Sequence, residues 1–303
     1  MSNGAKMKKT TPNQWGGKWT VAKLEAFADY VNAYLIIMTK QREKYKGWPR
    51  KICYFDGFAG SGANERLNLS NKNILFDATE EELSVYQGAA ERVLNLENKF
   101  DKYYFVDIAP NNIQTLKDRL TSKGLVAPDT CQFIAGEMNE EIKKFLTQLD
   151  RDSVALVLLD PFGMSIQWES IREMQNKRVD LWILIPSGVI INRLLDKEGK
   201  LEHADKLENF FGLSTEEIKE KFYKVENIPN LFGELEVSKK IDNAIEIIAE
   251  LYVQQLKTIF KEVTKQPLVL KNSKNVAIYH FVFASNNKTA LKIASQIIEK
   301  KQL

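Results

Sequence analysis

Cysteine and histidine are scarce in this sequence, which has 303 residues and only two of each. Cys53 and Cys131 lie in apolar, strand-like runs. They predict buried thiols of a reducing compartment, not a disulfide framework or a metal site. His203 and His280 lack the spacing of metal ligands. The sequence therefore predicts a cytoplasmic protein without a metal centre.

Other signals are missing as well. No apolar run reaches membrane-spanning length. The polar, basic N-terminus has no apolar segment of the kind that directs secretion. A Gly-Lys-Ser or Gly-Lys-Thr sequence is absent, so a P-loop for nucleoside triphosphates is not expected. The net charge of +3 is too small to demand a polyanionic partner.

Two tracts without acids depart from this balanced charge, at residues 1–24 and 263–298. Each contains five lysines, and together they can line a surface for phosphate backbones. A solvated tail and an ordinary exposed edge explain the same tracts equally well. Nucleic acid is therefore one expected partner, and no membrane contact is expected.

The pattern of apolar residues predicts an α/β fold. A helical pattern begins near Thr20, a candidate N-cap, and continues to about Tyr45. Five apolar runs follow, which we interpret as strands at residues 51–55, 102–107, 131–137, 153–160 and 179–187. Helical patterns separate them at 88–98, 110–123, 139–149 and 167–176. Strands that are apolar throughout are buried on both faces, so these runs predict a parallel sheet covered by helices.

The second half of the chain adds an insertion to this pattern. Residues 189–262 are expected to be largely helical, most clearly at 240–262, with a capping box at 214–217. A hairpin with a polar turn at 272–275 and a helix at 287–300 close the chain. The organisation predicted is a flexible basic arm, 1–19, and one domain, 20–303. The long Asn-rich connection at 63–85 has a length that is often functional.

Four successive predicted strands end in an acid: Asp56, Asp107, Glu137 and Asp160. In an open parallel sheet, ligands bind at the carboxyl ends of the strands. Asp56 opens the glycine-rich turn "DGFAGSG", in which Gly60 and Gly62 permit left-handed backbone angles and a close approach of a ligand. An ordinary tight turn has the same composition.

Each of the other acids also has two interpretations. Asp107 can accept hydrogen bonds from both hydroxyls of a ribose, or it can cap the helix after Pro110. Gly136, Glu137 and Met138 can contact an adenine ring, whereas capping of the helix at 139–149 explains Glu137 more simply.

The fourth strand ends in the sequence Asp160-Pro161-Phe162-Gly163. The carboxylate of Asp160 can hold an acceptor amine, and Phe162 can stack on a planar ring. The alternative is a turn that ends the strand, with a phenylalanine in the core.

These strand ends, in this order, resemble class I S-adenosylmethionine-dependent methyltransferases. The resemblance implies a Rossmann-like, mostly parallel seven-stranded sheet with an antiparallel last strand, and S-adenosylmethionine as cofactor. It assigns the cofactor to the turn after Asp56 and to the two residues that end the second strand. The residues of these two segments are Gly57, Phe58, Ala59, Gly60, Gly62, Asp107 and Ile108. Asp160–Gly163 resembles the Asp-Pro-Pro-Tyr turn of enzymes that methylate base amines, with Phe162 and Gly163 replacing the second proline and the aromatic.

A wider resemblance, to the bacterial three-Cys-motif partner (TcmP) proteins, rests on "WTVAKLEAFADYV", "YFDGFAGSG", "YYFVDIAPNNIQTLK", "LLDPFG" and "YHFVFASNNKTALKIA". It implies a methyltransferase-like protein linked to mobile elements or phage defence. The partner implied is a three-cysteine protein of radical-SAM type.

Lys23 lies where related methyltransferases bring an N-terminal element over the carboxylate of the cofactor's methionine. A solvated helix lysine is the simpler expectation. Two functions follow: methyl transfer to a nucleic-acid-like acceptor, or a non-catalytic partner that docks another protein through residues 189–262. A nucleic-acid hydrolase is disfavoured, because no clustered carboxylates have metal-ligand spacing.

Overall fold

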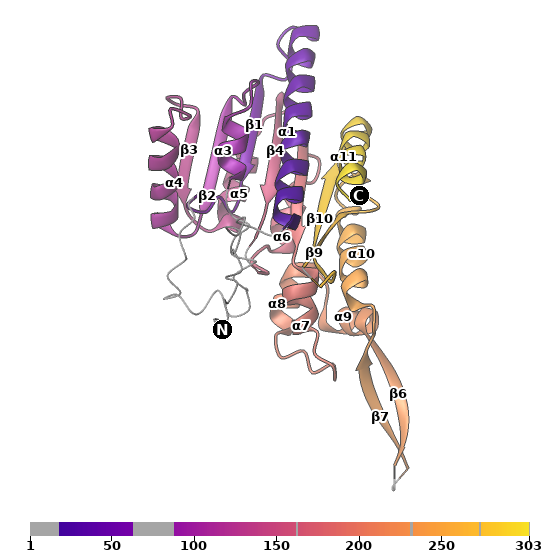
Figure 1. Cartoon of the computed structure of the whole chain (residues 1–303). Helices are drawn as coiled ribbons and strands as arrows, with labels where there is room; N and C mark the ends of the chain where they lie inside the picture. Colours follow the sequence, from indigo (N-terminus) through magenta and orange to yellow (C-terminus); the bar gives the residue numbers. More distant parts are fainter. Residues whose placement is uncertain (1–17, 63–87, 162, 231–232, 273, 303) are drawn as a thin grey trace, which may run out of the picture.

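The computed structural model describes residues 18–62, 88–161, 163–230, 233–272 and 274–302 (Figure 1). Its main sheet has the strand order β3-β2-β1-β4-β5-β10-β8, and β9 also pairs with β10. The strands are β1 (Lys51–Asp56), β2 (Lys102–Asp107), β3 (Cys131–Ala135), β4 (Ser153–Leu159), β5 (Val179–Ile185), β8 (Glu262–Val263), β9 (Leu268–Lys271) and β10 (Ala277–Ser285).

The sheet is parallel from β1 to β5, whereas β10 runs antiparallel to β5 and forms the predicted hairpin with β9. Every residue of β4 and β5 is buried, because helices cover both faces of the sheet. The predicted fold class is therefore confirmed. The sheet has eight strands where seven were expected, because β8 and β9 each pair with β10.

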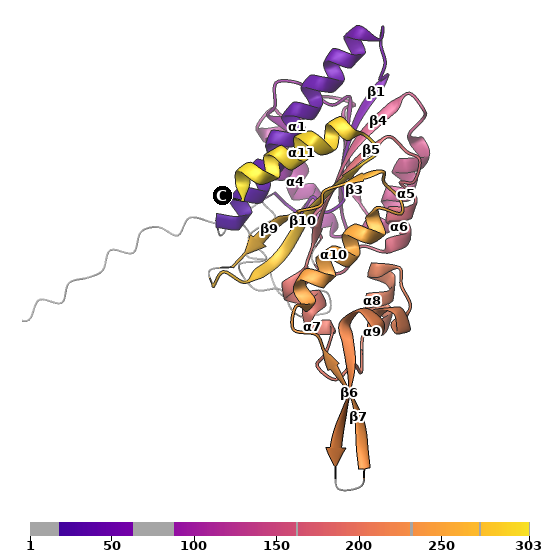
Figure 2. The ribbon, with the colours of Figure 1, turned by 90° about the vertical axis from the view of Figure 1, so that its right-hand side faces the viewer.

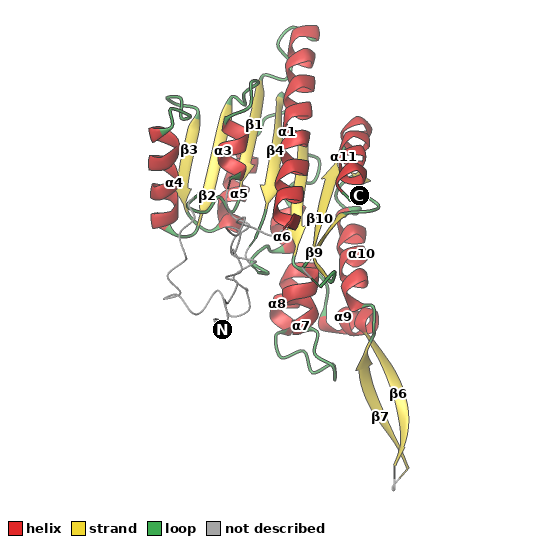
Figure 3. Ribbon diagram, in the orientation of Figure 1, coloured by secondary structure: helices red, strands yellow, loops and turns green. Residues whose placement is uncertain are grey.

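Figure 2 shows the sheet between two helical layers, and Figure 3 distinguishes its strands from the helices by colour. One layer consists of α1 (Lys18–Lys44), α3 (Ala89–Leu94), α4 (Pro110–Ser122) and α11 (Lys288–Lys301). The other contains α5 (Met138–Gln148), α6 (Trp168–Arg172) and α10 (Ala244–Leu256). Under α1 the core is aromatic: Trp182 of β5 lies 4.6 Å from Phe281 of β10 between ring centroids. The apolar face of α1 thus packs against the sheet.

The insertion between β5 and β10 is less helical than predicted. It contains a π-helical turn (Ser187–Ile191), α7 (Asn192–Leu194), α8 (Ala204–Phe211), α9 (Thr215–Phe222) and the hairpin β6 (Tyr223–Asn230) with β7 (Gly233–Lys240). The capping box of Ser214 and Glu217 is confirmed at the start of α9. The hairpin was not predicted, and it projects from the body (Figure 1).

Several boundary predictions need correction. The first helix begins at Lys18, so Thr20 lies inside it and not at its cap. Most of the predicted arm, 1–19, lies outside the described residues. The helix expected at 240–262 covers only Ala244–Leu256, because β7 extends to Lys240 and β8 begins at Glu262. Cys53 is buried as predicted, but Cys131 is only half-buried. None of the described helices is long and apolar enough to cross a membrane.

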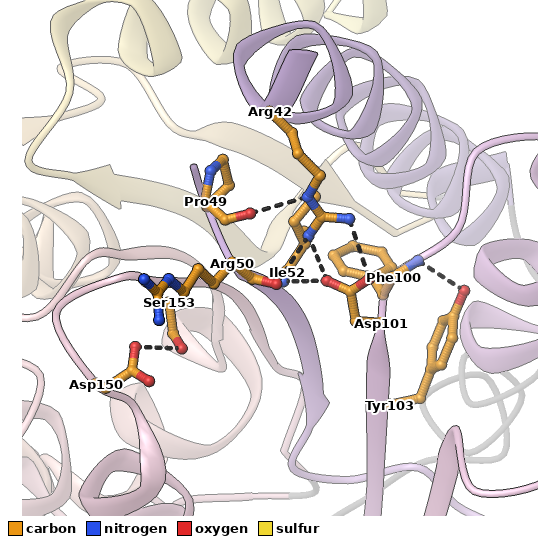
Figure 4. Close-up of polar contacts among 9 residues, drawn as sticks. All are labelled: Arg42, Pro49, Arg50, Ile52, Phe100, Asp101, Tyr103, Asp150 and Ser153. Atoms are coloured by element: carbon orange, nitrogen blue, oxygen red, sulfur yellow. Dashed lines mark hydrogen bonds and ion pairs between the residues drawn. The ribbon is translucent and has the colours of Figure 1, made fainter. Parts of the chain in front are cut away.

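The C-terminal end of α1 is tied to the beginnings of β1 and β2 (Figure 4). The Arg42 guanidinium donates two hydrogen bonds to the Asp101 carboxylate, at 3.1 and 2.5 Å, and a third to the Pro49 carbonyl, at 2.8 Å. Asp101 also accepts a 2.7 Å bond from the Ile52 amide. The network sets the position of a helix of 27 residues, about 40 Å long, from one end.

We expect Arg42→Ala to lower the free energy of unfolding by about 1–2 kcal/mol, because a bidentate, charge-assisted pair is lost. Urea denaturation followed by circular dichroism measures this loss. Arg50→Ala is the matched control: its 3.8 Å ion pair with Asp152 is exposed, so its loss should be below about 0.5 kcal/mol. Equal losses in the two variants would contradict the anchoring role.

Candidate functional site

The strand-ending acids lie at one edge of the sheet, as predicted for parallel strands. The register pairs Asp56 of β1 with Phe105 of β2 and with Leu158 of β4. Asp107 and Asp160 therefore each lie two residues beyond the level of Asp56, on either side of it. All three are nearly inaccessible, with exposed fractions of 2%, 9% and 6%.

Lys23 reaches this edge from α1 and forms an ion pair with Asp160. Its side chain is only 2% exposed, so the expectation of a solvated helix lysine is wrong. Burial lowers the pKa of Lys23, while the charges of Asp160 and Asp56 oppose that shift. One ammonium thus faces two carboxyl groups in a site shielded from water.

Asp56 is the second carboxyl of this cluster. It accepts hydrogen bonds from the Tyr54 hydroxyl, at 3.2 Å, and from the Phe58 amide, at 3.3 Å. Burial raises the pKa of Asp56 from 3.8 to about 7, with a further contribution from the negative charge of Asp160. When Asp56 is ionised, the cluster of Lys23, Asp56 and Asp160 carries one more negative charge than positive.

The glycines of the turn after β1 have different tasks. A Cβ on Gly57 would lie 2.7 Å from Met138 and 2.8 Å from Leu159, so this glycine serves close packing and not ligand access. Gly60 and Gly62 have φ angles of +60° and +62°, which glycine adopts without strain. The predicted left-handed angles are therefore confirmed at these two positions.

Asp107 connects this turn to the end of β2. One of its oxygens accepts from the Ala109 amide, at 2.8 Å, and from the Asn112 side chain, at 3.0 Å. The other accepts from the Gly60 amide, at 3.1 Å, and among the described residues it meets no other donor, which leaves one lone pair. Burial raises the pKa of Asp107, and these donors oppose the shift. Next to it, the apolar side chain of Ile108 is 61% exposed.

The end of β3 has a structural explanation. Glu137 caps α5 by accepting from the Glu140 amide, at 3.1 Å, which confirms the simpler of its two interpretations. Met138 is buried against Gly57 and does not cover an open surface. A Cβ on Gly136 would lie 2.9 Å from the Glu141 side chain, so this glycine too has little free space.

Asn139 was missed by the sequence analysis although it organises the neighbouring loop. Its side chain donates to the Glu137 carboxylate, at 2.6 Å, and to the Ser165 carbonyl, at 2.7 Å. It accepts from the Gln167 amide, at 2.9 Å. A buried asparagine at the start of a helix gives no sequence signal that separates it from a solvated one.

The turn after β4 is described only in part. Pro161 is buried, and Gly163 has a φ angle of +77°. Phe162 lies outside the described residues, as does the 63–85 connection. Within the described part of the chain, no group of three or more His, Cys, Asp or Glu side chains is suited to a metal ion.

The 263–298 tract divides between the two ends of the sheet. Because β10 is antiparallel to β5, the turn that carries Lys271 and Lys274 lies at the same end as the acids. Lys288 and Lys292 follow the other end of β10 at the start of α11. The tract therefore does not form one continuous surface. Most of the 1–24 tract lies outside the described residues.

We call the end of the sheet that carries Asp56, Asp107 and Asp160 the acid edge. Three of its features can contact a ligand. A lone pair of Asp107 can accept from a hydroxyl, exposed Ile108 can cover an apolar ring, and the buried cluster favours a positive charge. These features suit a nucleoside that carries a cationic group.

No family model matches the chain, and no curated protein matches it. Solved structures with a similar course of the chain include protein LPL1258 from Legionella pneumophila, with 13% identity, a TM-score of 0.33, and coverage of 86% of this chain and 98% of that one. An rRNA methylase from Streptococcus thermophilus has 13% identity, a TM-score of 0.29, and coverage of 71% and 94%.

The N-terminal domain of EvdMO1, solved with S-adenosylhomocysteine bound, has 10% identity, a TM-score of 0.32, and coverage of 82% and 81%. At these identities and TM-scores, the likenesses do not indicate what any residue of this chain does.

We expect Asp56→Asn to change how stability depends on pH. The pKa of Asp56 in the folded protein lies above its ordinary value of 3.8. The contribution of Asp56 to the free energy of unfolding is therefore complete below about pH 4 and is lost as the pH rises through about 7. Asparagine does not ionise; its oxygen can accept from the Phe58 amide, and its nitrogen can donate to the Tyr54 hydroxyl. We therefore expect the free energy of unfolding of the variant, relative to that of the wild type, to be higher at pH 8 than at pH 5. Urea denaturation at the two pH values measures it. A difference that does not change with pH would contradict a raised pKa.

The Lys23 ion pair can be tested by a double-mutant cycle. Lys23→Met should lower the free energy of unfolding by about 3 kcal/mol, because it leaves a buried carboxylate without its cation. Adding Asp160→Asn should restore at least about 1 kcal/mol, because the stranded charge is removed as well. Strictly additive losses would show that the two side chains do not stabilise each other.

Proposed function

We propose that this protein is an S-adenosylmethionine-dependent methyltransferase whose cofactor binds at the carboxyl ends of β1, β2 and β4. The observation that carries the proposal is the buried cluster of Lys23, Asp56 and Asp160 beside the turn held by Asp107. With Asp56 ionised, this cluster has an excess negative charge that an incoming cation would neutralise. The methyl donor is cationic at sulfur.

The residues of the edge fit the parts of this cofactor. Asp107 has one lone pair for a ribose hydroxyl, and Ile108 offers an exposed apolar surface to the adenine ring. The turn with Gly60 and Gly62 would lie along the methionine part. When bound, the cofactor supplies an electrophilic methyl group that is activated by the positive charge on sulfur.

The protein's own part in such a reaction is electrostatic and positional. Lys23 holds Asp160 in place, and Asp56 adds negative charge near the position of the sulfonium. An acceptor amine that bound Asp160 would have to share this carboxylate with Lys23. The same negative charge favours the cationic donor over the neutral thioether product, so it would promote product release.

We propose a nucleic acid as the acceptor, as in the enzymes that the Asp160–Gly163 turn resembles. Lys271 and Lys274 support this choice, because both are exposed at the same end of the sheet as the acids. Membership of the TcmP family and a role in phage defence are part of the same proposal. They rest on the sequence resemblance alone.

A second candidate function is that of a non-catalytic partner protein. The observation that favours it is the hairpin β6–β7, which projects from the body of the molecule and exposes Val225 at 66% (Figure 2). In this case the Lys23–Asp160 pair would be purely structural, and the hairpin would contact the three-cysteine protein. A methyl-transfer screen over DNA, RNA and protein separates the two candidates, because only the first predicts a product.

Ile108→Ser tests the position of the cofactor without disturbing the core. We expect the dissociation constant of S-adenosylmethionine to rise about five- to tenfold, because the apolar contact with the ring is lost. Isothermal titration calorimetry measures it. Ile36→Ser, on α1 with 37% exposure, is the matched control and should leave the affinity unchanged. An equal effect of both substitutions, or of neither, would place the cofactor elsewhere.

A further inference from the structure

The buried cluster at the acid edge holds two carboxyl groups but only one ammonium. Asp56 ends β1, and Asp160 directly follows the neighbouring strand β4. Lys23 of α1 pairs with Asp160, and among the described residues it forms no ion pair with Asp56. All three side chains are buried. The charges in this site therefore do not balance when both carboxyl groups are ionised.

The hydrogen bonds of Asp56 do not supply the missing positive charge. Within the described part of the chain, its carboxyl group accepts from the Tyr54 hydroxyl, at 3.2 Å, and from the Phe58 amide, at 3.3 Å. Both donors are neutral, because burial raises the pKa of Tyr54 well above its ordinary value. A buried carboxylate without a cation is unfavourable, and the binding of a proton removes its charge. The arrangement thus favours a protonated Asp56 in the free protein.

The titratable groups that face Asp56 come from three elements. Lys23 lies on α1, Tyr54 on β1 and Asp160 at the end of β4. Burial raises the pKa of Asp56 to about 7, Asp160 raises it further, and Tyr54 and Lys23 oppose the shift. Near neutral pH, Asp56 is therefore close to half protonated, and a new charge nearby would change its protonation.

We propose that binding of S-adenosylmethionine displaces one proton from Asp56 to the solvent, and that this exchange makes the site distinguish the methyl donor from the demethylated product. The inference rests on the proposed function. The sulfonium does not need to touch Asp56, because a unit charge acts over several ångströms where the effective dielectric constant is low. After methyl transfer the sulfur is neutral, so Asp56 regains a proton and the product loses this electrostatic attraction.

Lys23 is the alternative source of a proton, because burial lowers its pKa. Its ion pair with Asp160 opposes the loss of that proton, whereas Asp56 has no such partner among the described residues. The two sources are separated by substituting Asp56.

Calorimetric titration of the full chain at pH 6.5 in PIPES and in ACES, two buffers with different heats of ionisation, counts the protons released. We expect roughly 0.5–1 proton per S-adenosylmethionine and almost none per S-adenosylhomocysteine, because only the first is cationic at sulfur. Between pH 8 and pH 6, the dissociation constant of S-adenosylmethionine should rise about tenfold, and that of S-adenosylhomocysteine less than about twofold.

Equal proton release by both ligands, or binding of S-adenosylmethionine without proton release, would overturn the inference and leave the proposed function standing. Absence of binding by both ligands at every pH would contradict the proposed function and the inference with it.

Asp56→Asn identifies the source of the proton. Because asparagine does not ionise, the variant should bind S-adenosylmethionine without proton release and with equal affinity at pH 6 and pH 8. Asp180→Asn is the matched control: Asp180 is buried at the beginning of β5, away from the acid edge, and burial raises its pKa to about 6. This control should release as many protons as the wild type. Proton release that persists in Asp56→Asn would assign the proton to another group and overturn the inference.

Discussion

The rest of the acid edge depends on the buried ion pair between Lys23 and Asp160. An ammonium and a carboxylate that are both shielded from water tolerate little separation, since either alone would be strongly unfavourable. Lys23 must therefore lie over the end of β4, and α1 must cross the sheet to bring it there. Arg42 and Asp101 hold the other end of the same helix. Two polar contacts and an aromatic core thus determine the position of α1.

The pair also determines the electrostatics of the neighbouring groups. Asp56 lies near both partners and is only 2% exposed, and burial raises its pKa to about 7. The net charge of the cluster therefore changes near neutral pH. Asp107 stands apart from this cluster and holds the glycine turn in place through the Gly60 amide. One edge of the sheet thus combines a region that favours positive charge with a region that accepts hydroxyl groups, which is the basis of the proposed function.

The sequence predicted the sheet, its buried strands and the acids that end them, because apolar runs and strand ends are local features. It also predicted the capping of α5 by Glu137 and of α9 by Ser214 and Glu217. It did not predict that Lys23 is buried, since its partner Asp160 lies 137 positions away. The hairpin β6–β7 was missed because its charged residues match a helical surface equally well. Asp180, which is buried at the beginning of β5, was predicted only as part of a strand.

The most direct test of the central claim is a crystal structure of the protein grown with S-adenosylhomocysteine. The account predicts electron density for the nucleoside at the carboxyl ends of β1 and β2, with a ribose hydroxyl bonded to Asp107 and the adenine ring against Ile108. Density at another place, or an unliganded edge at saturating ligand, would contradict it.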